Sequence, residues 1–265
     1  MAHSHETVLI SGASSGIGEA LAWLFAEQGY DLVLVARSED KLAELAHALA
    51  TDHGVEAQCY PADLSKSGAA RRLFNAVDGD GVQIDILVNN AGVLEHGAFI
   101  DMAAAQHQRM IQLNVAGLTD LLSHFLPPMA ERGYGRVCNV ASIAGFMPVP
   151  SLATYAATKA YVLSLSEALA EEMRPHGVSV TALCPGVTAT NMVAQVQEDN
   201  DTFAKMPGML ISDVDDVARE AFKACMKGTP IVVPGNLNLA TTLAARSTPK
   251  WLVRRLSGLL GRSSL

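Results

Sequence analysis

Two side chains that can move a proton, Tyr155 and Lys159, are spaced by one helical turn in Tyr155-Ala-Ala-Thr-Lys159. On a helix this spacing places both on one face. A phenol holds its proton up to about pH 10, and a neighbouring ammonium lowers the phenol pKa by stabilising the phenolate. The pair is therefore a candidate proton donor. Since amphipathic helices also produce this spacing by chance, its meaning depends on the other motifs.

A glycine-rich turn follows the first predicted strand and opens a helical pattern. Its glycines are Gly12, Gly16 and Gly18. Glycines let backbone amides approach a pyrophosphate closely, and the helix N-terminus adds partial positive charge. The spacing Gly-x-x-x-Gly-x-Gly differs from the general dinucleotide fingerprint. Ser14 and Ser15 either bond a phosphate or close the turn.

A basic residue, Arg37, follows the second predicted strand. Dinucleotide folds that bind NAD usually have an acid there, which contacts the adenosine ribose. A guanidinium can instead pair with a 2′-phosphate. The alternative is a solvated arginine that opens the next helix. We interpret Arg37 as a phosphate ligand, which predicts NADP(H) preferred over NAD(H).

The elements that must position these residues alternate along the chain. Runs such as Val8-Leu9-Ile10 are apolar at consecutive positions, which is typical of strands covered on both faces, and the intervening helical patterns are long enough for right-handed crossovers. We predict a Rossmann-type, doubly wound α/β fold, with a seven-stranded, mainly parallel sheet and helices on both faces. The predicted strands are residues 7–11, 31–36, 55–60, 84–89, 136–141, 178–183 and 231–233.

Size and composition favour a single domain over residues 1–265, because the chain is 49% hydrophobic and long enough for one large core. Four separated cysteines indicate buried free thiols, and neither they nor the eight histidines have metal-ligand spacing. The first residues lack a signal-peptide pattern, and no run is long enough to span a bilayer. A cytoplasmic location is the default expectation.

Charge is distributed unevenly. The net charge of −8 argues against general nucleic-acid binding. From residue 221 onwards, however, there are seven basic residues and no Asp or Glu. Residues 237–265 form a basic, amphipathic C-terminal extension, within which residues 249–261 can form a helix. Two interpretations stay open: a weak peripheral contact with anionic lipid or an acidic acyl carrier, or a helix that closes the substrate pocket or packs on another subunit.

Taken together, the order and spacing of the motifs resemble the short-chain dehydrogenase/reductase (SDR) family over about residues 6–235. The resemblance rests on Gly12-Ala-Ser-Ser-Gly-Ile-Gly18, Asn89-Asn-Ala-Gly92, Asn114, Ser142, Tyr155-x-x-x-Lys159 and Pro185-Gly186. It implies an enzyme that acts on CH–OH donors with NAD(P)⁺ as acceptor, interconverting a ketone or aldehyde and an alcohol. The nicotinamide supplies the hydride and Tyr155 supplies the proton.

The resemblance implies four catalytic residues: Asn114, Ser142, Tyr155 and Lys159. Ser142 ends a predicted strand at the sheet edge where open α/β sheets bind ligands, without a Gly-x-Ser-x-Gly nucleophile elbow. By the family's pattern its hydroxyl orients the substrate oxygen, while Asn114, in a predicted helix over residues 102–131, holds a water chain to Lys159. Lys159 lowers the Tyr155 pKa and binds the ribose hydroxyls.

The resemblance also implies cofactor contacts. Asp63 contacts the adenine beside Leu64; Ser65 can cap the following helix equally well, so the aspartate is not needed as a cap. After the sixth strand, Thr190 matches the family threonine at the nicotinamide carboxamide, with Thr188 as the alternative. The full set is Gly12, Ser14, Ser15, Gly16, Ile17, Gly18, Arg37, Asp63, Leu64, Asn90, Ala91, Gly92, Tyr155, Lys159, Pro185, Gly186, Thr188 and Thr190.

Three segments border the substrate in this family, here residues 93–99, 143–152 and 191–210. They are rich in apolar side chains, which suits a small apolar carbonyl compound or alcohol, although core packing explains many of them. The expected substrate contacts are Ser142, Phe146 and Met192.

Residues 187–211 are expected to form a flexible, methionine-rich substrate lid. The acidic segment 212–216 that follows predicts a helix N-terminus, not a metal site.

In the family, the helices that carry Asn114 and Tyr155 often form a dimer interface. A homodimer or homotetramer is therefore expected, although the apolar residues from Leu163 to Met173 could also pack entirely within one subunit. Two other functions stay open: a 3-oxoacyl reductase acting on carrier-bound chains, and a non-catalytic NADP(H)-binding regulatory protein. The intact catalytic set argues against the second.

Overall fold

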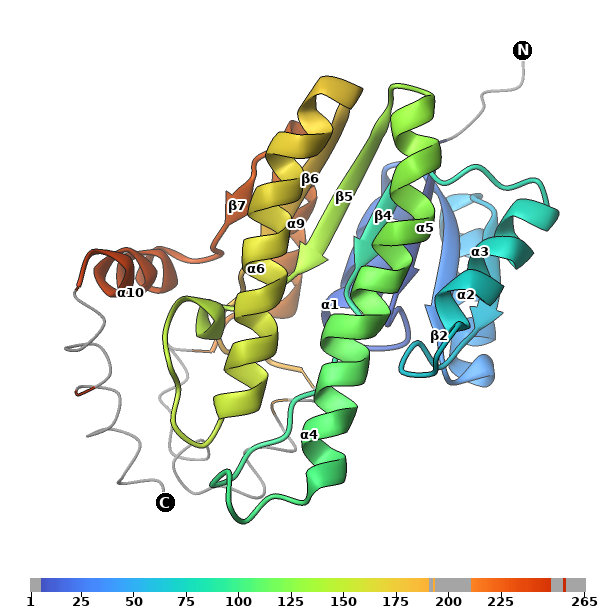
Figure 1. Cartoon of the computed structure of the whole chain (residues 1–265). Coiled ribbons are helices and arrows are strands. Elements are labelled where there is room, and N and C mark those ends of the chain that lie inside the picture. The colour runs from blue at the N-terminus through green and yellow to red at the C-terminus, as the bar shows by residue number, and fades with distance from the viewer. Residues whose placement is uncertain (1–5, 191–192, 194–210, 249–254, 256–265) are drawn as a thin grey trace.

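The computed structural model describes residues 6–190, 193, 211–248 and 255. Their strands form one seven-stranded sheet in the order β3-β2-β1-β4-β5-β6-β7, and every neighbouring pair is parallel (Figure 1). The strands are β1 (Thr7–Ser11), β2 (Asp31–Ala36), β3 (Ala57–Pro61), β4 (Ile86–Asn89), β5 (Gly135–Val140), β6 (Val178–Leu183) and β7 (Ile231–Val232). The doubly wound α/β prediction is confirmed.

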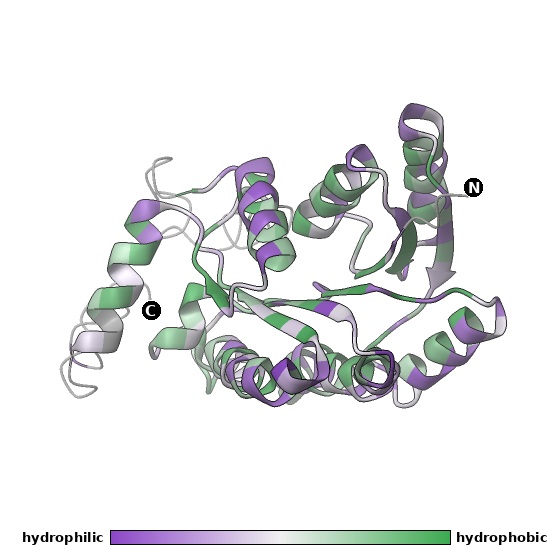
Figure 2. Ribbon diagram, turned by 90° about the horizontal axis from the view of Figure 1, so that it is seen from above, coloured by the Kyte–Doolittle hydropathy of each residue, from purple (hydrophilic) through white to green (hydrophobic). Residues whose placement is uncertain are grey.

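Helices cover both faces of the sheet (Figure 2). They are α1 (Gly16–Glu27), α2 (Glu39–His53), α3 (Ala69–Gly79), α4 (Ala104–Ile111), α5 (Leu118–Glu131), α6 (Ala153–Met173), α9 (Val214–Lys227) and α10 (Asn236–Ser247). Three short helical segments join them: η1 (Gln112–Gly117), η2 (Ile143–Phe146) and η3 (Arg174–His176). Asp213 begins α9 by accepting the amides of Asp215 and Asp216 at 2.9 and 3.2 Å, as predicted for that segment.

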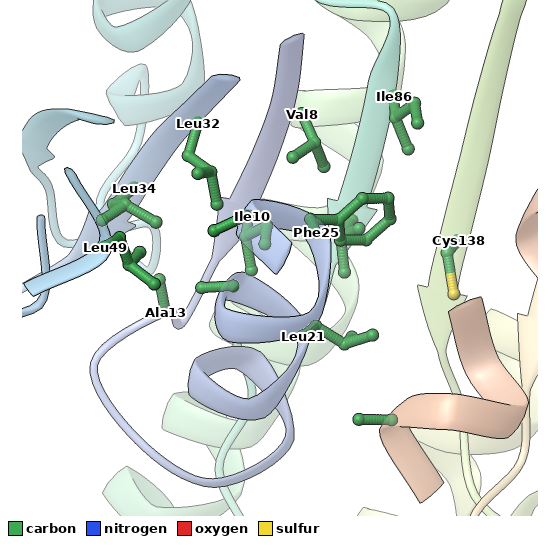
Figure 3. Close-up of a cluster of buried hydrophobic side chains, with 14 of the residues drawn as sticks. Val8, Ile10, Ala13, Leu21, Phe25, Leu32, Leu34, Leu49, Ile86 and Cys138 are labelled. Atoms are coloured by element: carbon green, nitrogen blue, oxygen red, sulfur yellow. The ribbon is translucent and has the colours of Figure 1, made fainter. Parts of the chain in front are cut away.

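The strands contribute alternate residues to two cores. Val8 and Ile10 pack with Phe25 and the helices α1, α2 and α9, whereas Leu9 faces α3, α5 and α6 (Figure 3). Both faces of the sheet are therefore covered by helices and shielded from water. This explains why the strands are apolar at consecutive positions. The carboxyl ends of the strands point to a common edge, where loops can carry functional side chains.

Several predicted boundaries differ from those of the structure. The third and fourth strands begin two residues later than predicted, at Ala57 and Ile86. More importantly, the single helix predicted over residues 102–131 is broken by the π-helical segment η1, which contains Asn114. Gly117 of η1 packs on the next layer: a Cβ there would lie 2.5 Å from the Leu64 carbonyl oxygen. The wider turn is thus fixed by tertiary contacts.

Two further sequence predictions concern the cysteines and membrane-spanning segments. Cys138, Cys184 and Cys225 are buried and Cys59 is half-buried, and none of these four residues forms a disulfide bond. Within the residues that the structure covers, we found no helix that is both long and apolar enough to cross a bilayer.

Candidate functional site

A large cavity of about 870 Å³ follows the carboxyl edge of the sheet. It runs from the loop between β1 and α1, past the ends of β2 and β4, to Ser142, Tyr155 and the loop after β6, and Thr241 of α10 also lines it. Of the predicted cofactor residues, all but Gly18 line this cavity.

The glycine loop is folded tightly onto the end of β4. Gly12 has a φ of +69°, and a Cβ there would lie 2.8 Å from Asn90 Nδ2 and 2.9 Å from Ala91 Cα. At Gly18 a Cβ would lie 2.3 Å from the Gly12 carbonyl oxygen. Gly18 therefore shapes the loop from behind the cavity, without lining it.

The start of α1 fits an anion. Ser15 occupies the N-cap position, yet its side chain makes no capping hydrogen bond, and both Ser14 and Ser15 line the cavity. The first amides of α1 thus face the cavity without a side-chain acceptor, and these amides carry the positive end of the helix dipole. A pyrophosphate group fits this cradle.

Asn90 ties β4 to β1 at this point. Its Nδ2 donates to the carbonyls of Ser11 and Gly12 at 3.0 and 3.1 Å, while the Ser11 hydroxyl accepts the amides of Asn90 and Ala91. The Asn90 side chain thereby fixes the backbone at the start of the glycine loop.

Arg37, Asp63 and Leu64 lie together at the cavity end beyond β2 and β3. Asp63 Oδ1 accepts the Ser65 hydroxyl at 2.6 Å and the Ser65 amide at 3.1 Å. The hydroxyl bond is the largest cause of a lowered Asp63 pKa, to which the charges of Lys66 and Arg37 add. Helix α3 begins only at Ala69, with Gly68 as its N-cap. The suggestion that Asp63 or Ser65 caps the helix was therefore wrong, since the two bond each other in the preceding turn.

Lys66 and Ser67 also line this end and were missed at the sequence level. Lys66 supplies a second cation beside Arg37. The only signal in the sequence is their position directly after Asp63 and Leu64, within a turn whose path depends on the Asp63–Ser65 bonds.

Tyr155 and Lys159 lie one turn apart on α6, as predicted. Lys159 Nζ is 5.8 Å from the centre of the Tyr155 ring and donates to the Val140 carbonyl at 2.7 Å. Ser142, at the end of β5, hydrogen-bonds the Tyr155 hydroxyl. The Ser142 hydroxyl also accepts the Ala144 amide at 3.1 Å.

Burial dominates the acid–base properties of this pair. It raises the pKa of Tyr155 to about 12, and the Ser142 hydrogen bond opposes part of that rise. Burial also lowers the pKa of Lys159 to about 8, because the residue is only 5% exposed. The Lys159 ammonium donates to the Val140 carbonyl, and the lowering of the Tyr155 pKa by Lys159 stays a prediction.

Asn114 is 1% exposed and sits behind the cavity wall. Its Oδ1 accepts the Val93 amide at 2.8 Å, and its Nδ2 donates to the Val93 carbonyl at 2.9 Å and to Thr158 Oγ1 at 3.2 Å. A Cβ on Gly92 would lie 3.3 Å from Asn114 Oδ1 and 3.6 Å from Lys159 Nζ. Asn114 therefore fixes the loop after β4 beside Lys159, and the water chain stays a prediction.

The loop after β6 closes the site. The Pro185 carbonyl accepts the Ile143 amide at 3.0 Å and the Ser142 hydroxyl at 3.5 Å. Thr188 is buried, and its hydroxyl donates to the Gly186 carbonyl at 3.1 Å. Thr190 lies across from Gly16, where a Cβ would come within 3.0 Å of Thr190 Cγ2. The loop thus faces the start of α1 across the cavity.

The substrate end of the cavity is mainly apolar. The apolar side chains that line it are Leu94, Ile143, Met147, Val149, Leu152, Val187 and Val193. Phe146 does not line it but packs against the core on the α6 side of the sheet, and Phe99, 62% exposed, lies against His107. Met192 and most of the expected lid fall outside the described residues. Gln108, Arg109 and Gln112 add a polar wall that we did not anticipate.

The fold and this site define a dinucleotide-binding α/β enzyme. The family model described as short chain dehydrogenase matches residues 6–201, and the chain belongs to this family. An uncharacterized oxidoreductase of Bacillus subtilis, YvrD, is 36% identical over 209 residues, which is 75% of this chain and 77% of that protein. The chain is thus an oxidoreductase of the SDR family.

Two solved structures are similar over nearly the whole chain. A short-chain dehydrogenase from Sphingobium yanoikuyae in complex with NADPH has a TM-score of 0.81 at 33% identity, covering 92% of this chain and 96% of its own. A bulky-bulky ketone specific alcohol dehydrogenase from Comamonas testosteroni has a TM-score of 0.76 at 30% identity, covering 92% and 95%. Among the residues described for the present chain, we found no cluster of His, Cys, Asp or Glu that could hold a metal ion.

Proposed function

We propose that this SDR oxidoreductase uses NADP(H) to interconvert a ketone or aldehyde and an alcohol on a mainly apolar substrate. One observation carries the proposal: one continuous cavity joins the glycine loop and Arg37 to Ser142 and Tyr155, and ends among apolar side chains. The resemblance to a bulky-ketone alcohol dehydrogenase supports the apolar substrate class.

In the proposed reaction, the bound nicotinamide supplies the hydride in reduction and accepts it in oxidation. Ser142 holds the substrate oxygen beside the Tyr155 hydroxyl, with which it already shares a hydrogen bond. Because its pKa is raised to about 12, Tyr155 holds its proton at neutral pH and can donate it as negative charge grows on the oxygen. Lys159 presents its ammonium beside Gly92 to the ribose hydroxyls.

The preference for NADP(H) rests on the adenosine end of the cavity. Arg37 takes the position where an acid would contact a 2′-hydroxyl, and Lys66 adds a second cation near Asp63. Two cations there favour a cofactor with an extra phosphate. An NADPH complex among the similar structures supports this choice.

A homodimer or homotetramer formed through α5 and α6 belongs to the same proposal. Leu163 is buried, and Leu165, Leu169 and Met173 are partly buried against the core, so these residues serve the subunit itself. The exposed part of the α5–α6 surface instead includes Tyr161, which is bonded to Thr119. Sedimentation equilibrium of the wild type and a Tyr161→Glu variant tests this interface, and a monomeric wild type would contradict it.

The basic C-terminal extension is proposed to make a weak contact with anionic lipid or an acyl carrier, and this peripheral contact would accompany a cytoplasmic location. The helix expected over residues 249–261 lies outside the described residues, apart from Arg255. Flotation with phosphatidylserine vesicles, with and without residues 246–265, tests the lipid contact. Equal flotation of the two proteins contradicts it.

The proposed reaction is tested by a panel of apolar ketones and aldehydes with NADPH, using Tyr155→Phe as the control. Turnover that depends on Tyr155 supports the proposal. Cofactor binding without turnover on any carbonyl would point to a regulatory protein, and turnover confined to 3-oxoacyl thioesters would point to the carrier-linked reductase.

A further inference from the structure

Asn238, in the first turn of α10, packs against the loop that follows β6. A Cβ on Gly186 would lie 2.5 Å from both Nδ2 and Oδ1 of Asn238, and 2.7 Å from its Cγ. Such a distance is well inside van der Waals contact, so the flat amide of Asn238 rests directly on the Gly186 backbone. Gly186 is not among the glycines with a positive φ, so it is space, and not backbone conformation, that excludes other residues at this position.

The Asn238 amide is itself held in place. Its Nδ2 donates to the Pro234 carbonyl at 2.9 Å and lies 3.4 Å from the Ser212 hydroxyl, which accepts a longer bond. One turn later, the hydroxyl of the buried Thr242 donates to the Asn238 carbonyl at 2.8 Å. The side-chain amide cannot swing away from Gly186 without losing its bonds to Pro234 and Ser212.

Ser212 connects Asn238 to the loop that follows β6. The Ser212 amide donates to the Val187 carbonyl at 2.8 Å, and the Ser212 carbonyl accepts the Ala189 amide at 3.0 Å. These bonds join residues 187–189, at the start of the segment expected to be a lid, to Ser212, which follows that segment. Asn238 therefore contacts Ser212, which is bonded to this loop, as well as Gly186.

The opposite side of the same loop is bonded to the catalytic serine, because the Pro185 carbonyl accepts the Ser142 hydroxyl. The loop is thus clamped between Ser142 and Asn238. Releasing the Asn238 side would let Gly186 and the residues after it shift, while the glycine loop and Arg37, which Asn238 does not contact, keep their own supports.

We infer that Asn238 is a positioning residue, which holds the Pro185–Thr190 loop at the nicotinamide end of the cofactor site and joins it to Ser212. This role rests on the proposed function, since it assumes that the loop meets the nicotinamide. It makes α10 part of the active-site framework, although the residues of α10 lie far from Gly186 in the sequence.

Loss of the Asn238 side chain should affect binding of the nicotinamide half of the cofactor and not of the adenosine half. Asn238→Ala should weaken NADPH binding by about tenfold, as expected for loss of a hydrogen-bonded support, and leave the affinity for 2′,5′-ADP, which has no nicotinamide, within about twofold. Isothermal titration measures both affinities. Asn236→Ala, an exposed residue of the same turn, is the matched control and should change neither. Equal weakening of the two ligands, or no weakening, would overturn the role.

Asn238→Asp provides a second variant if the alanine protein does not fold. It keeps the side-chain volume against Gly186 but places an oxygen opposite the Pro234 carbonyl, so NADPH should again weaken while 2′,5′-ADP does not. Unchanged NADPH affinity in this variant would count against the hydrogen bonds as the support.

A double-mutant cycle tests the contact without any cofactor. Gly186→Ala should lower the Tm, because the new Cβ clashes with the side-chain amide of Asn238. Adding Asn238→Ala removes the clashing atoms and should restore at least about half of the lost Tm. Simple additivity of the two changes would overturn the inference. If the wild type binds neither NADPH nor 2′,5′-ADP, the proposed cofactor is wrong, and this cycle then decides on Asn238 alone.

Discussion

The Nζ of Lys159 lies 5.8 Å from the centre of the Tyr155 ring. The ammonium is anchored by a 2.7 Å bond to the carbonyl of Val140, the last residue of β5. The sheet, and not the phenol, therefore sets the position of the charge. This arrangement leaves Lys159 buried and Tyr155 partly buried, with the Tyr155 pKa raised to about 12 and the Lys159 pKa lowered to about 8.

Replacing Tyr155 with phenylalanine removes the proposed proton donor and keeps the ring. We expect the rate of ketone reduction to fall by at least about 100-fold, the lower range for loss of a general acid, and the affinity for NADPH to change little. Initial rates and fluorescence titration measure the two effects. Tyr161→Phe, on the same helix and bonded to Thr119, is the control. Near-normal turnover by the Tyr155→Phe variant would exclude Tyr155 as the donor.

Arg37→Asp should reverse the cofactor preference. A charge-assisted bond to a phosphate is worth about 1.5–3 kcal/mol, so the kcat/KM ratio of NADPH over NADH should fall by about 10- to 100-fold, and the aspartate can accept a 2′-hydroxyl. Steady-state kinetics with each cofactor measure this ratio. Arg71→Asp, an exposed arginine at the start of α3, makes the same charge change away from the cavity. An equal response to both substitutions would reduce the effect to general electrostatics.

Much of this site follows from local sequence. The β-branched runs identify the strands, and the Tyr155–Lys159 spacing places the pair on one helix face. The π-helical turn around Asn114 could not be predicted, because it depends on bonds to Val93 and on the close contact of Gly117 with Leu64, which are distant in the chain. The role of Asn238 could not be predicted for the same reason, because its neighbours in the loop after β6 are distant in the chain.

Asn114→Ala should weaken both stability and catalysis. The substitution leaves the partly buried amide and carbonyl of Val93 without their side-chain partners, which should lower the free energy of unfolding by about 2–4 kcal/mol. Because Val93 lines the cavity, kcat should fall as well. Urea unfolding and initial rates measure the effects. Asn114→Asp keeps the acceptor for the Val93 amide and should lose less stability. An alanine protein as stable as the wild type would contradict this role.

The buried ammonium of Lys159 predicts a specific dependence of stability on pH. The folded pKa of about 8 lies below the ordinary value of 10.5, so between these pH values the unfolded chain binds more protons than the folded protein. Stability contributed by this group therefore rises with pH across that window. Relative to Lys159→Met, the free energy of unfolding of the wild type should increase by up to about 3 kcal/mol between pH 7 and pH 10.

Urea unfolding of both proteins without cofactor measures this difference, and the comparison cancels the other titrating groups because the two proteins share them. Lys159→Arg is the second reference, since a guanidinium keeps its charge over the whole window and should track the methionine protein. If the differences in the free energy of unfolding between the wild type and each variant stay constant from pH 7 to pH 10, burial of the Lys159 ammonium costs no stability. The bond to Val140 would then have to compensate fully for its desolvation.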